Sequence, residues 1–340
     1  MSARPRLLLT HVPDARASYY GAEALAGLTR LGDVILHESP LPLADKDLVR
    51  AAQGCALIVA DRNTAFPASV LAALPETVAV LRCAVDIRNI DVDAASTQGI
   101  LVTQASRSWI ASVAELTIGL ILDAARGISS ANVAYKAGRN ATAAMGIQLE
   151  GRTAGLVGFG PLGRRVAELC RAFGMQVLVA DPYVTVSEPG LTQVALDDLL
   201  ARSDFVVLLA VATAETENLI GAAALSQMKP TAFLINVARG NLVDEAALVR
   251  ALDGRRIAGA ALDVGRAPDQ MPSPTLTFRP DVVATPHTGG LTRPAIEGQA
   301  LETVRQAAEV IEGRVPAGAM NADHARRLAG LRSPPRSDLA

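Results

Sequence analysis

Gly158-Phe159-Gly160-Pro161-Leu162-Gly163 is the stretch that decides the fold of this chain. An apolar run over 153–157 precedes it, and apolar residues recur at helical spacing after it. A second apolar run over 176–180 then ends at Asp181. The order of strand, glycine turn, helix, strand and acid is typical of a dinucleotide-binding βαβ unit, because the glycines permit a tight turn and a close approach of the backbone to a pyrophosphate.

NAD is the cofactor that this unit predicts. The helix that follows the glycine turn offers unpaired N–H groups to the phosphates. Asp181 can accept hydrogen bonds from an adenosine ribose and would repel a 2′-phosphate, which favours NAD over NADP. The cofactor contacts predicted from this stretch are Gly158, Gly160, Pro161, Leu162, Gly163 and Asp181.

Composition limits the classes of function that remain. The chain has 340 residues, enough for two domains, and its net charge of −2 provides no electrostatic footprint for nucleic acid. Its three cysteines form no CxxC pair and stand in apolar contexts, which favours buried reduced thiols over disulfides or a metal site. The most apolar helical stretch, 113–128, contains charged residues and is expected to be a buried or interface helix. We therefore expect a cytoplasmic protein without a membrane, metal or nucleic-acid partner.

Short apolar runs alternate with helical patterns along most of the chain, which predicts parallel α/β sheets with helices on both faces. The strands expected before the glycine stretch are 6–10, 34–37, 56–59, 78–83 and 100–103. Those expected with and after it are 154–157, 177–180, 205–209, 232–236, 259–262 and 282–285. One further helix is expected over 294–313, and the Arg-containing end 325–336 is expected to be frayed and solvated.

Several further motifs occur in an order that is typical of one family. They are Asn89-Ile90-Asp91, Ser112-Val113-Ala114-Glu115, Thr213-Ala214-Glu215-Thr216, Asn236-Val237-Ala238-Arg239-Gly240, Val243-Asp244-Glu245, Ala261-Leu262-Asp263-Val264 and Thr285-Pro286-His287. On these motifs and the glycine stretch, the chain resembles the D-isomer-specific 2-hydroxyacid dehydrogenases from about Leu81 to Asn321.

The resemblance implies two doubly wound parallel-sheet α/β domains and a homodimer. A flavodoxin-like substrate domain would combine 1–108 with 287–330, and a Rossmann NAD domain would span 109–286. The last residues, 331–340, are expected to form a disordered tail. A substrate cleft would lie between the two domains.

Hydride transfer between nicotinamide and a 2-hydroxy acid needs an acid/base, a positive donor for the developing alkoxide and an anchor for the carboxylate. His287 suits the first task, because an imidazole titrates near neutral pH and here stands beside Gly289 and Gly290. A structural histidine at a strand end is the alternative. Arg239 follows an expected strand, and its forked guanidinium suits a carboxylate and the adjacent carbonyl oxygen together.

The resemblance also assigns cofactor contacts beyond the glycine stretch. Asp263 would accept a hydrogen bond from the nicotinamide carboxamide, although a helix N-cap is the alternative for this residue. Val237 and Ala238 would contribute backbone contacts to the same ring. The NAD site implied by the resemblance is completed by Thr213, Val237, Ala238, Arg239, Asp263, His287 and Gly290.

One departure from the family concerns the partner of the catalytic histidine. The family usually places a glutamate a few residues beyond Asp-Val, followed by Pro, and this glutamate holds the histidine tautomer. Here Ala267 or Pro268 stands at that place. Three alternatives remain: Asp269 reaches His287 from a shifted loop, a substrate group supplies the charge, or nothing replaces the glutamate.

A second departure concerns the substrate loop, where the family commonly has Gly-Val-Gly. Here Val85 and Asp86 offer their N–H groups to a carboxylate, and Arg88 would attract an anion that Asp86 repels. A surface Asp–Arg pair is an equal alternative. Arg107 and Trp109 are further candidate substrate residues at an expected hinge, and a purely packed Trp109 is the alternative.

The sequence thus predicts an NAD-dependent oxidoreductase acting on a small 2-hydroxy or 2-keto acid. Arg239 and His287 would carry the reaction, with Asp269 as a third catalytic candidate. The absent glutamate motivates the alternative of a catalytically weak or inactive NAD(H)-binding regulatory protein.

Overall fold

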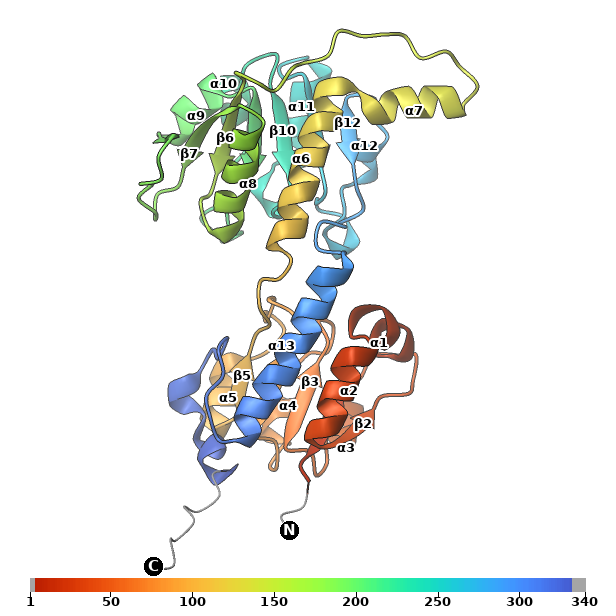
Figure 1. Ribbon diagram of the computed structural model, residues 1–340, viewed down its shortest axis with the longest axis vertical. Helices are drawn as coiled ribbons and strands as arrows, with labels where there is room; N and C mark the ends of the chain where they lie inside the picture. Colours follow the sequence, from red (N-terminus) through yellow and green to blue (C-terminus); the bar gives the residue numbers. More distant parts are fainter. Residues whose placement is uncertain (1–3, 332–340) are drawn as a thin grey trace, which may run out of the picture. The chain divides into compact units, whose positions relative to one another are not determined.

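The computed structural model describes residues 4–331, which divide into two compact units (Figure 1). Unit 1 contains the chain up to Ser108 and again from Arg293, whereas unit 2 spans Trp109–Thr292. Each unit has its own parallel β-sheet, which confirms the predicted α/β fold with two parallel sheets. The chain re-enters unit 1 later than the expected residue 287, so that His287 belongs to unit 2. Most of the expected tail 331–340 lies outside the described residues.

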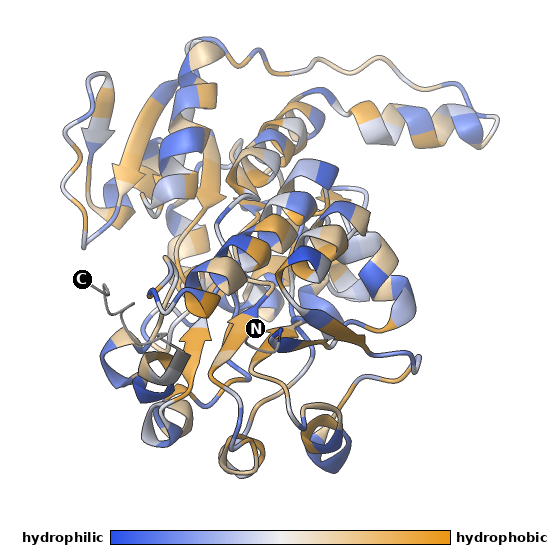
Figure 2. Ribbon diagram, turned by 60° about the horizontal axis from the view of Figure 1, so that its bottom comes forward, coloured by the Kyte–Doolittle hydropathy of each residue, from blue (hydrophilic) through white to orange (hydrophobic). Residues whose placement is uncertain are grey.

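Unit 1 has a five-stranded sheet in the order β2-β1-β3-β4-β5, which is the flavodoxin-like order. Its strands are β1 (Arg6–Leu9), β2 (Asp33–Leu36), β3 (Leu57–Ala60), β4 (Ala79–Arg82) and β5 (Leu101–Thr103). One face packs against α2 (Ala22–Leu31) and α13 (Arg293–Ile311). The other packs against α3 (Asp45–Ala51), α4 (Ala68–Ala72) and α5 (Val92–Gln98). Since both faces are covered, the central strands consist mostly of apolar residues, which Figure 2 draws in orange.

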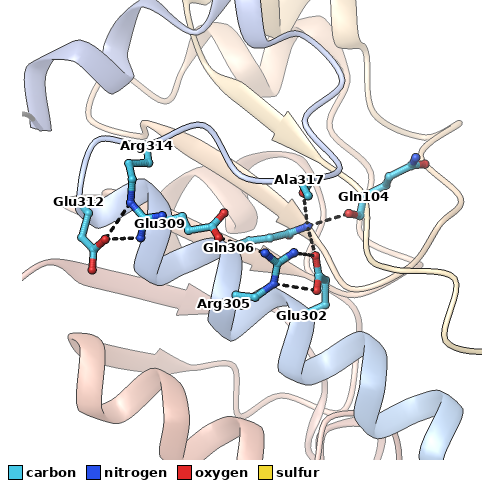
Figure 3. Close-up of polar contacts among 8 residues, drawn as sticks. All are labelled: Gln104, Glu302, Arg305, Gln306, Glu309, Glu312, Arg314 and Ala317. Carbon is cyan, nitrogen blue, oxygen red and sulfur yellow. Dashed lines mark hydrogen bonds and ion pairs between the residues drawn. The ribbon is translucent and has the colours of Figure 1, made fainter.

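A buried amide attaches the returning helix α13 to the sheet of unit 1. The Gln306 side chain donates to the main-chain oxygens of Gln104 at 2.8 Å and Ala317 at 3.0 Å (Figure 3). It also accepts from Thr103 Oγ1 at 2.7 Å. On the same helix, Arg305 forms ion pairs with Glu302 and Glu309. The bonds of Gln306 join residues about two hundred positions apart, so the discontinuous unit is closed by tertiary contacts rather than by local sequence.

Unit 2 has a seven-stranded sheet in the order β12-β11-β10-β9-β6-β7-β8, which is the Rossmann order extended by one strand. Its strands are β6 (Thr153–Val157), β7 (Gln176–Ala180), β8 (Leu191–Gln193), β9 (Phe205–Leu208), β10 (Phe233–Asn236), β11 (Gly259–Leu262) and β12 (Val282–Ala284). Helices α6 (Ile110–Arg126) and α8 (Pro161–Ala172) cover one face. Helices α9 (Leu196–Arg202), α10 (Ala222–Gln227), α11 (Glu245–Asp253) and α12 (Pro274–Thr277) cover the other.

The expected strands agree with the structure to within one or two residues, but some elements were not predicted. Strand β8 is short, polar and half-exposed, so it lacks the apolar run that marks the other strands. Helices α1 (Pro13–Tyr19) and α7 (Ile128–Lys136) bury no residue, so the sequence has no apolar periodicity that would predict them.

The expectation of a frayed C-terminal end is wrong for its first part. Residues Arg326–Leu331 form a 3₁₀ helix, and the Arg327 guanidinium donates to the carbonyl oxygens of Leu74 and Thr77. Leu328 is 4% exposed and belongs to the core beneath α13. Burial of Leu328 and capping of two carbonyls therefore hold this segment on unit 1.

The three cysteines are free and buried, and burial raises the pKa of the Cys83 and Cys170 thiols to about 12. Among residues 4–331, none of the helices has both the length and the apolarity to cross a membrane.

A buried polar cluster lies where β1, β3 and β4 end, beside the point at which the strand order of unit 1 reverses. Arg82 is fully buried and donates to the main-chain oxygens of Asp61 and Thr64 and to the side chain of Asn89. Asp61 accepts from Thr10 Oγ1 at 3.0 Å and from the Thr64 N–H at 3.1 Å. The strand ends of unit 1 are thus tied together by charged groups that are excluded from water.

His11 belongs to the same region and makes unit 1 sensitive to acid. Burial lowers the pKa of His11 to about 4, and the charges of Arg82 and Arg16 act in the same direction against the attraction of Asp61. The unfolded chain therefore takes up a proton below about pH 6.5 that the folded chain takes up only near pH 4. We expect unit 1 to have its full stability above pH 6.5 and to lose about 3 kcal/mol as the pH falls to 4.

Urea unfolding followed by circular dichroism at several pH values measures this loss. His11→Gln should flatten the pH dependence, whereas His37→Gln, which changes an exposed ring that contacts the Leu41 carbonyl, should leave the slope as in the wild type. An unchanged slope in His11→Gln would assign the acid sensitivity to other groups.

Candidate active site

The predicted glycine turn connects β6 to α8, and its geometry requires glycine. Gly158 has a φ of 102°, and a Cβ at this position would lie 2.7 Å from the main-chain nitrogen of Ala210. A Cβ on Gly163 would lie 2.6 Å from the Gly158 carbonyl oxygen, so helix α8 packs directly on the turn. Helix α8 begins at Pro161 after the N-cap Gly160 and directs its first N–H groups towards the carboxyl edge of the sheet.

Asp181 at the end of β7 has a structural role that the sequence did not reveal. Its Oδ2 accepts from the N–H of Phe159 at 2.7 Å, and its Oδ1 accepts from the N–H of Tyr183 at 2.9 Å. The carboxylate therefore holds the second residue of the glycine turn. Contact with a ribose through the remaining lone pairs stays a prediction.

The loop after β10 carries Arg239. Asn236 shapes this loop, because its side chain accepts from the Ala238 N–H at 3.1 Å and donates to the Arg239 carbonyl at 2.9 Å. The guanidinium of Arg239 is half-buried, and one of its nitrogens donates to the Ala238 carbonyl at 2.7 Å. Val237 and Ala238 are buried. Contact of these residues with a nicotinamide ring stays a prediction.

The loops after β10 and β11 touch through two glycines. A Cβ on Gly240 would lie 2.0 Å from the carbonyl oxygen of Gly265, and no side chain fits between the two backbones. Since β10, β11 and β12 are neighbours in the sheet, the loops that carry Arg239, Asp263 and His287 leave the same edge.

Asp263 organises the loop that carries His287. The residue is 2% exposed, and its Oδ1 accepts from Thr285 Oγ1 at 2.6 Å and from the Thr288 N–H at 2.8 Å. Its Oδ2 accepts from the Gly289 N–H at 3.0 Å. The N-cap alternative is wrong, because Asp263 follows β11 directly and the next helical turn begins only at Pro268. Contact with a carboxamide stays a prediction for this residue.

His287 is half-buried in the loop after β12. The main-chain N–H of His287 donates to the main-chain carbonyl of Asp263 at 3.0 Å. Both the backbone and the side chain of Asp263 therefore fix this loop. The ring Nδ1 lies 2.7 Å from the main-chain oxygen of Asp269. Of the three alternatives for the absent glutamate, the structure thus places Asp269 beside His287, but the contact is made by the main-chain carbonyl.

The remaining cofactor candidates of unit 2 lie at loop ends. Thr213 is exposed after β9, and its N–H bonds the hydroxyl of Thr216 at 2.8 Å. Gly290 lies against Trp109, to whose Cβ an added Cβ would come within 3.5 Å. Trp109 precedes α6 and packs on the core of unit 2, as the packed alternative predicted, and its role towards a substrate stays a prediction.

Two substrate candidates of unit 1, Asp86 and Arg88, form the Asp–Arg pair that was one of the two alternatives in the sequence. Three hydrogen bonds connect the Arg88 guanidinium to the Asp86 carboxylate, the shortest at 2.6 Å. This pairing raises the pKa of Arg88. Val85 is half-buried and Arg107 is exposed. The Arg88 charge is thus neutralised locally by Asp86.

Sequence reasoning gave no role to several residues that build the site. Asn236 lies inside a quoted motif, and its position between a strand end and an arginine was the available signal. Thr285 also lies inside a quoted motif, whereas Thr288 and Arg266 gave no signal of their own, because their partners are more than twenty residues distant in the chain.

Comparisons with known proteins agree with this geometry. Residues 118–289, which include the glycine turn, Arg239, Asp263 and His287, match the family described as D-isomer specific 2-hydroxyacid dehydrogenase, NAD binding domain. The chain belongs to this family. Unit 2 is therefore its NAD-binding domain, as predicted from the glycine turn and Asp181.

Sequence relatives with curated names match most of the chain. D-3-phosphoglycerate dehydrogenase of Mycobacterium tuberculosis (strain ATCC 25618 / H37Rv) is 37% identical over 284 residues, which are 82% of this chain and 53% of that protein. The chain spans about half the length of the curated relatives that it matches first.

Two solved structures superpose on nearly the whole chain. A protein of Thermus thermophilus superposes with a TM-score of 0.83 at 31% identity and covers 93% of this chain and 99% of its own. The NAD-complexed D-isomer specific 2-hydroxyacid dehydrogenase of Lactobacillus delbrueckii ssp. bulgaricus superposes with a TM-score of 0.79 at 26% identity, covering 93% of this chain and all of its own.

Proposed function

We propose that this family member is an NAD-dependent oxidoreductase that transfers a hydride between nicotinamide and a small 2-hydroxy or 2-keto acid. The observation that carries the proposal is the buried Asp263 carboxylate, which fixes the loop of His287 by three hydrogen bonds inside an NAD-binding domain. Burial of a carboxylate costs free energy unless hydrogen bonds replace those it made to water. At Asp263 the replacing hydrogen bonds also hold His287 at the carboxyl edge of the sheet, where ligands of this fold bind.

The residues of unit 2 divide the reaction between them. When bound, NAD supplies the nicotinamide ring that accepts the hydride from the carbon bearing the hydroxyl group. His287 takes the hydroxyl proton as that carbon becomes a carbonyl, and returns a proton to the carbonyl oxygen in the reverse direction. Arg239 holds the substrate carboxylate and stabilises the negative charge that develops on the neighbouring oxygen.

The residues around the glycine turn would hold the cofactor. The N–H groups at the start of α8 would bind the pyrophosphate, and Asp181 would accept hydrogen bonds from the ribose hydroxyls. Val237, Ala238 and Asp263 would hold the nicotinamide, and Thr213 and Gly290 would complete the site. Val85, Asp86, Arg88, Arg107 and Trp109 are proposed to act on the substrate side.

A panel of 2-hydroxy and 2-keto acids, followed at the nicotinamide absorbance band with NADH and NADPH in parallel, tests the proposal. We expect turnover with at least one acid and a kcat/KM about 100-fold higher with NADH, because a 2′-phosphate near the Asp181 carboxylate costs about 3 kcal/mol. Asp181→Ser should lower the ratio of kcat/KM with NADH to kcat/KM with NADPH. The exposed Asp198→Ser on α9 serves as the matched control.

Two outcomes of the panel would revise the proposal. NADH binding without turnover on any acid would favour the alternative of an NAD(H)-binding regulatory protein. Equal use of NADPH by the wild type would remove the assigned role of Asp181 while leaving the reaction class intact.

A homodimer in the cytoplasm is the assembly and location that we propose. Helix α7 buries none of its residues, and Val133 and Tyr135 are 60% and 64% exposed on it. Helix α7 and the loop after it stand away from the sheet of unit 2 (Figure 1). A second copy would cover these apolar side chains. Sedimentation should give twice the chain mass of 35.3 kDa, and a monomer would exclude the dimer.

A further inference from the structure

The contact between His287 and Asp269 is built from unusual backbone. Asp269, Gln270 and His287 have φ values of 57°, 60° and 54°. These are three of the six non-glycine residues with positive φ among residues 4–331. Each such residue costs about 1–3 kcal/mol unless the surroundings determine its conformation. The surroundings of this loop therefore have to hold it.

Backbone bonds close the loop from the inside. The Gly265 N–H donates to the Gln270 carbonyl at 2.7 Å, and the Ala267 N–H donates to the Met271 carbonyl at 3.0 Å. The intervening turn begins at Pro268, whose ring fixes its own φ. With both ends joined, the carbonyl of Asp269 is left at the tip of the turn, where it meets the imidazole.

Arg266 holds the same loop from the outside. Its N–H donates to the Glu245 carboxylate at 2.9 Å. Its guanidinium donates to the Val243 carbonyl at 3.1 Å and to the Asn218 side chain at 2.6 Å, and it lies 2.8 Å from Glu217. Bonds to two separate segments of unit 2, 217–218 and 243–245, fix the start of the loop and hold the left-handed residues that follow in place.

The chemistry of a carbonyl oxygen determines the state of the imidazole. A carbonyl can only accept, so Nδ1 of His287 carries the proton at its 2.7 Å contact with Asp269. The neutral ring then has its lone pair on Nε2, which is the nitrogen that can take a proton from a substrate. A main-chain dipole thus fixes the tautomer and orientation of the ring.

We propose that the main-chain carbonyl of Asp269 is the positioning partner of His287, taking the place that a side-chain carboxylate holds elsewhere in the family. The inference rests on the proposed function for its catalytic meaning. It concerns the backbone conformation at residue 269 and is independent of the identity of the side chain there.

Substitutions at residue 269 separate the carbonyl from the carboxylate. Asp269→Asn and Asp269→Gly keep a left-handed backbone and should retain kcat within about twofold, because both residues tolerate this conformation. Asp269→Pro fixes φ near −65° and should lower kcat by about 10- to 100-fold, with a smaller change in KM. Arg255→Pro, at a left-handed position with φ 49° after α11, is the matched control for proline strain and should leave kcat unchanged.

The tautomer is measurable without turnover. The chain has four histidines, so ¹⁵N spectra near pH 8, where an ordinary imidazole is neutral, can be assigned with His287→Gln. We expect the Nδ1–H tautomer for His287 in the wild type, in Asp269→Asn and in Asp269→Gly, and its loss in Asp269→Pro. NADH binding by all variants verifies that unit 2 remains folded, even where kcat falls.

Three results would overturn the inference: a wild-type Nε2–H tautomer, a kcat in Asp269→Asn as low as in Asp269→Pro, or an unchanged kcat and tautomer in Asp269→Pro. The first two would assign the role to another group or to the carboxylate. A wild type that shows the Nδ1–H tautomer but no turnover on any acid would refute the proposed function and leave the carbonyl contact standing.

Discussion

His287→Ala should lower kcat by about 10²- to 10⁴-fold, which is the range that a positioned general acid or base contributes. The substrate hydroxyl then has no proton acceptor at the loop after β12, and water is a poor substitute. NADH binding should remain within about threefold of the wild type, because the glycine turn, Asp181 and the start of α8 are separate from the imidazole. Steady-state kinetics on the best acid of the panel, with NADH titrated separately by fluorescence, measures both quantities.

His324→Ala is the matched control for this substitution. His324 is exposed on a 3₁₀ turn of unit 1, and its loss should change neither kcat nor NADH binding. A kcat for His287→Ala within threefold of the wild type would contradict the acid/base role. Turnover would then have to depend on another proton acceptor.

Asp263→Asn should damage stability and catalysis together, although the two side chains have nearly the same shape. The carboxylate accepts from Thr285, Thr288 and Gly289, whereas an amide presents a donor at one of its two positions. At least one buried N–H or O–H group then loses its acceptor, which costs about 2–3 kcal/mol. The His287 loop is held by the same bonds, so we expect kcat to fall by about 10- to 100-fold as the imidazole shifts.

The single tryptophan reports this loss selectively. Trp109 packs on the core of unit 2, so its fluorescence during urea unfolding follows the unit that contains Asp263. Asp198→Asn, on the exposed surface of α9, is the matched control and should shift neither the unfolding midpoint nor kcat. A midpoint for Asp263→Asn equal to that of the wild type would show that the three bonds do not organise the loop.

The sequence determined the sheets of both units because their strands carry strong local signals. Runs such as Leu7–Leu9 and 205–208 are continuously apolar, as strands buried on both faces must be. The glycines at 158 and 163 specify a turn that other residues cannot adopt. The sequence also did not predict α12, which is only four residues long. The other missed elements, α1, α7 and β8, are short or exposed and bury little apolar surface.

The candidate site was predictable in its residue types but not in its contacts. Arg239, Asp263 and His287 follow strands, and parallel strands deliver the residues after them to one edge. Which atoms meet there depends on loops whose bonds cross long stretches of chain. The hydrogen bond from Arg266 to Asn218 and the contact of Asp269 with His287 are two such long-range contacts.

By itself, then, the sequence determined two parallel α/β sheets, an NAD-binding turn and the acid that accompanies it, because strand burial and glycine backbone are local properties. Only the tertiary structure decided that Asp181 holds the glycine turn, that Asp263 holds the histidine loop and that a main-chain carbonyl faces His287. A backbone carbonyl is present at every residue. The carbonyl of Asp269 contacts the imidazole because of its position. This position is fixed by the left-handed turn at Asp269 and by the hydrogen bonds of Arg266.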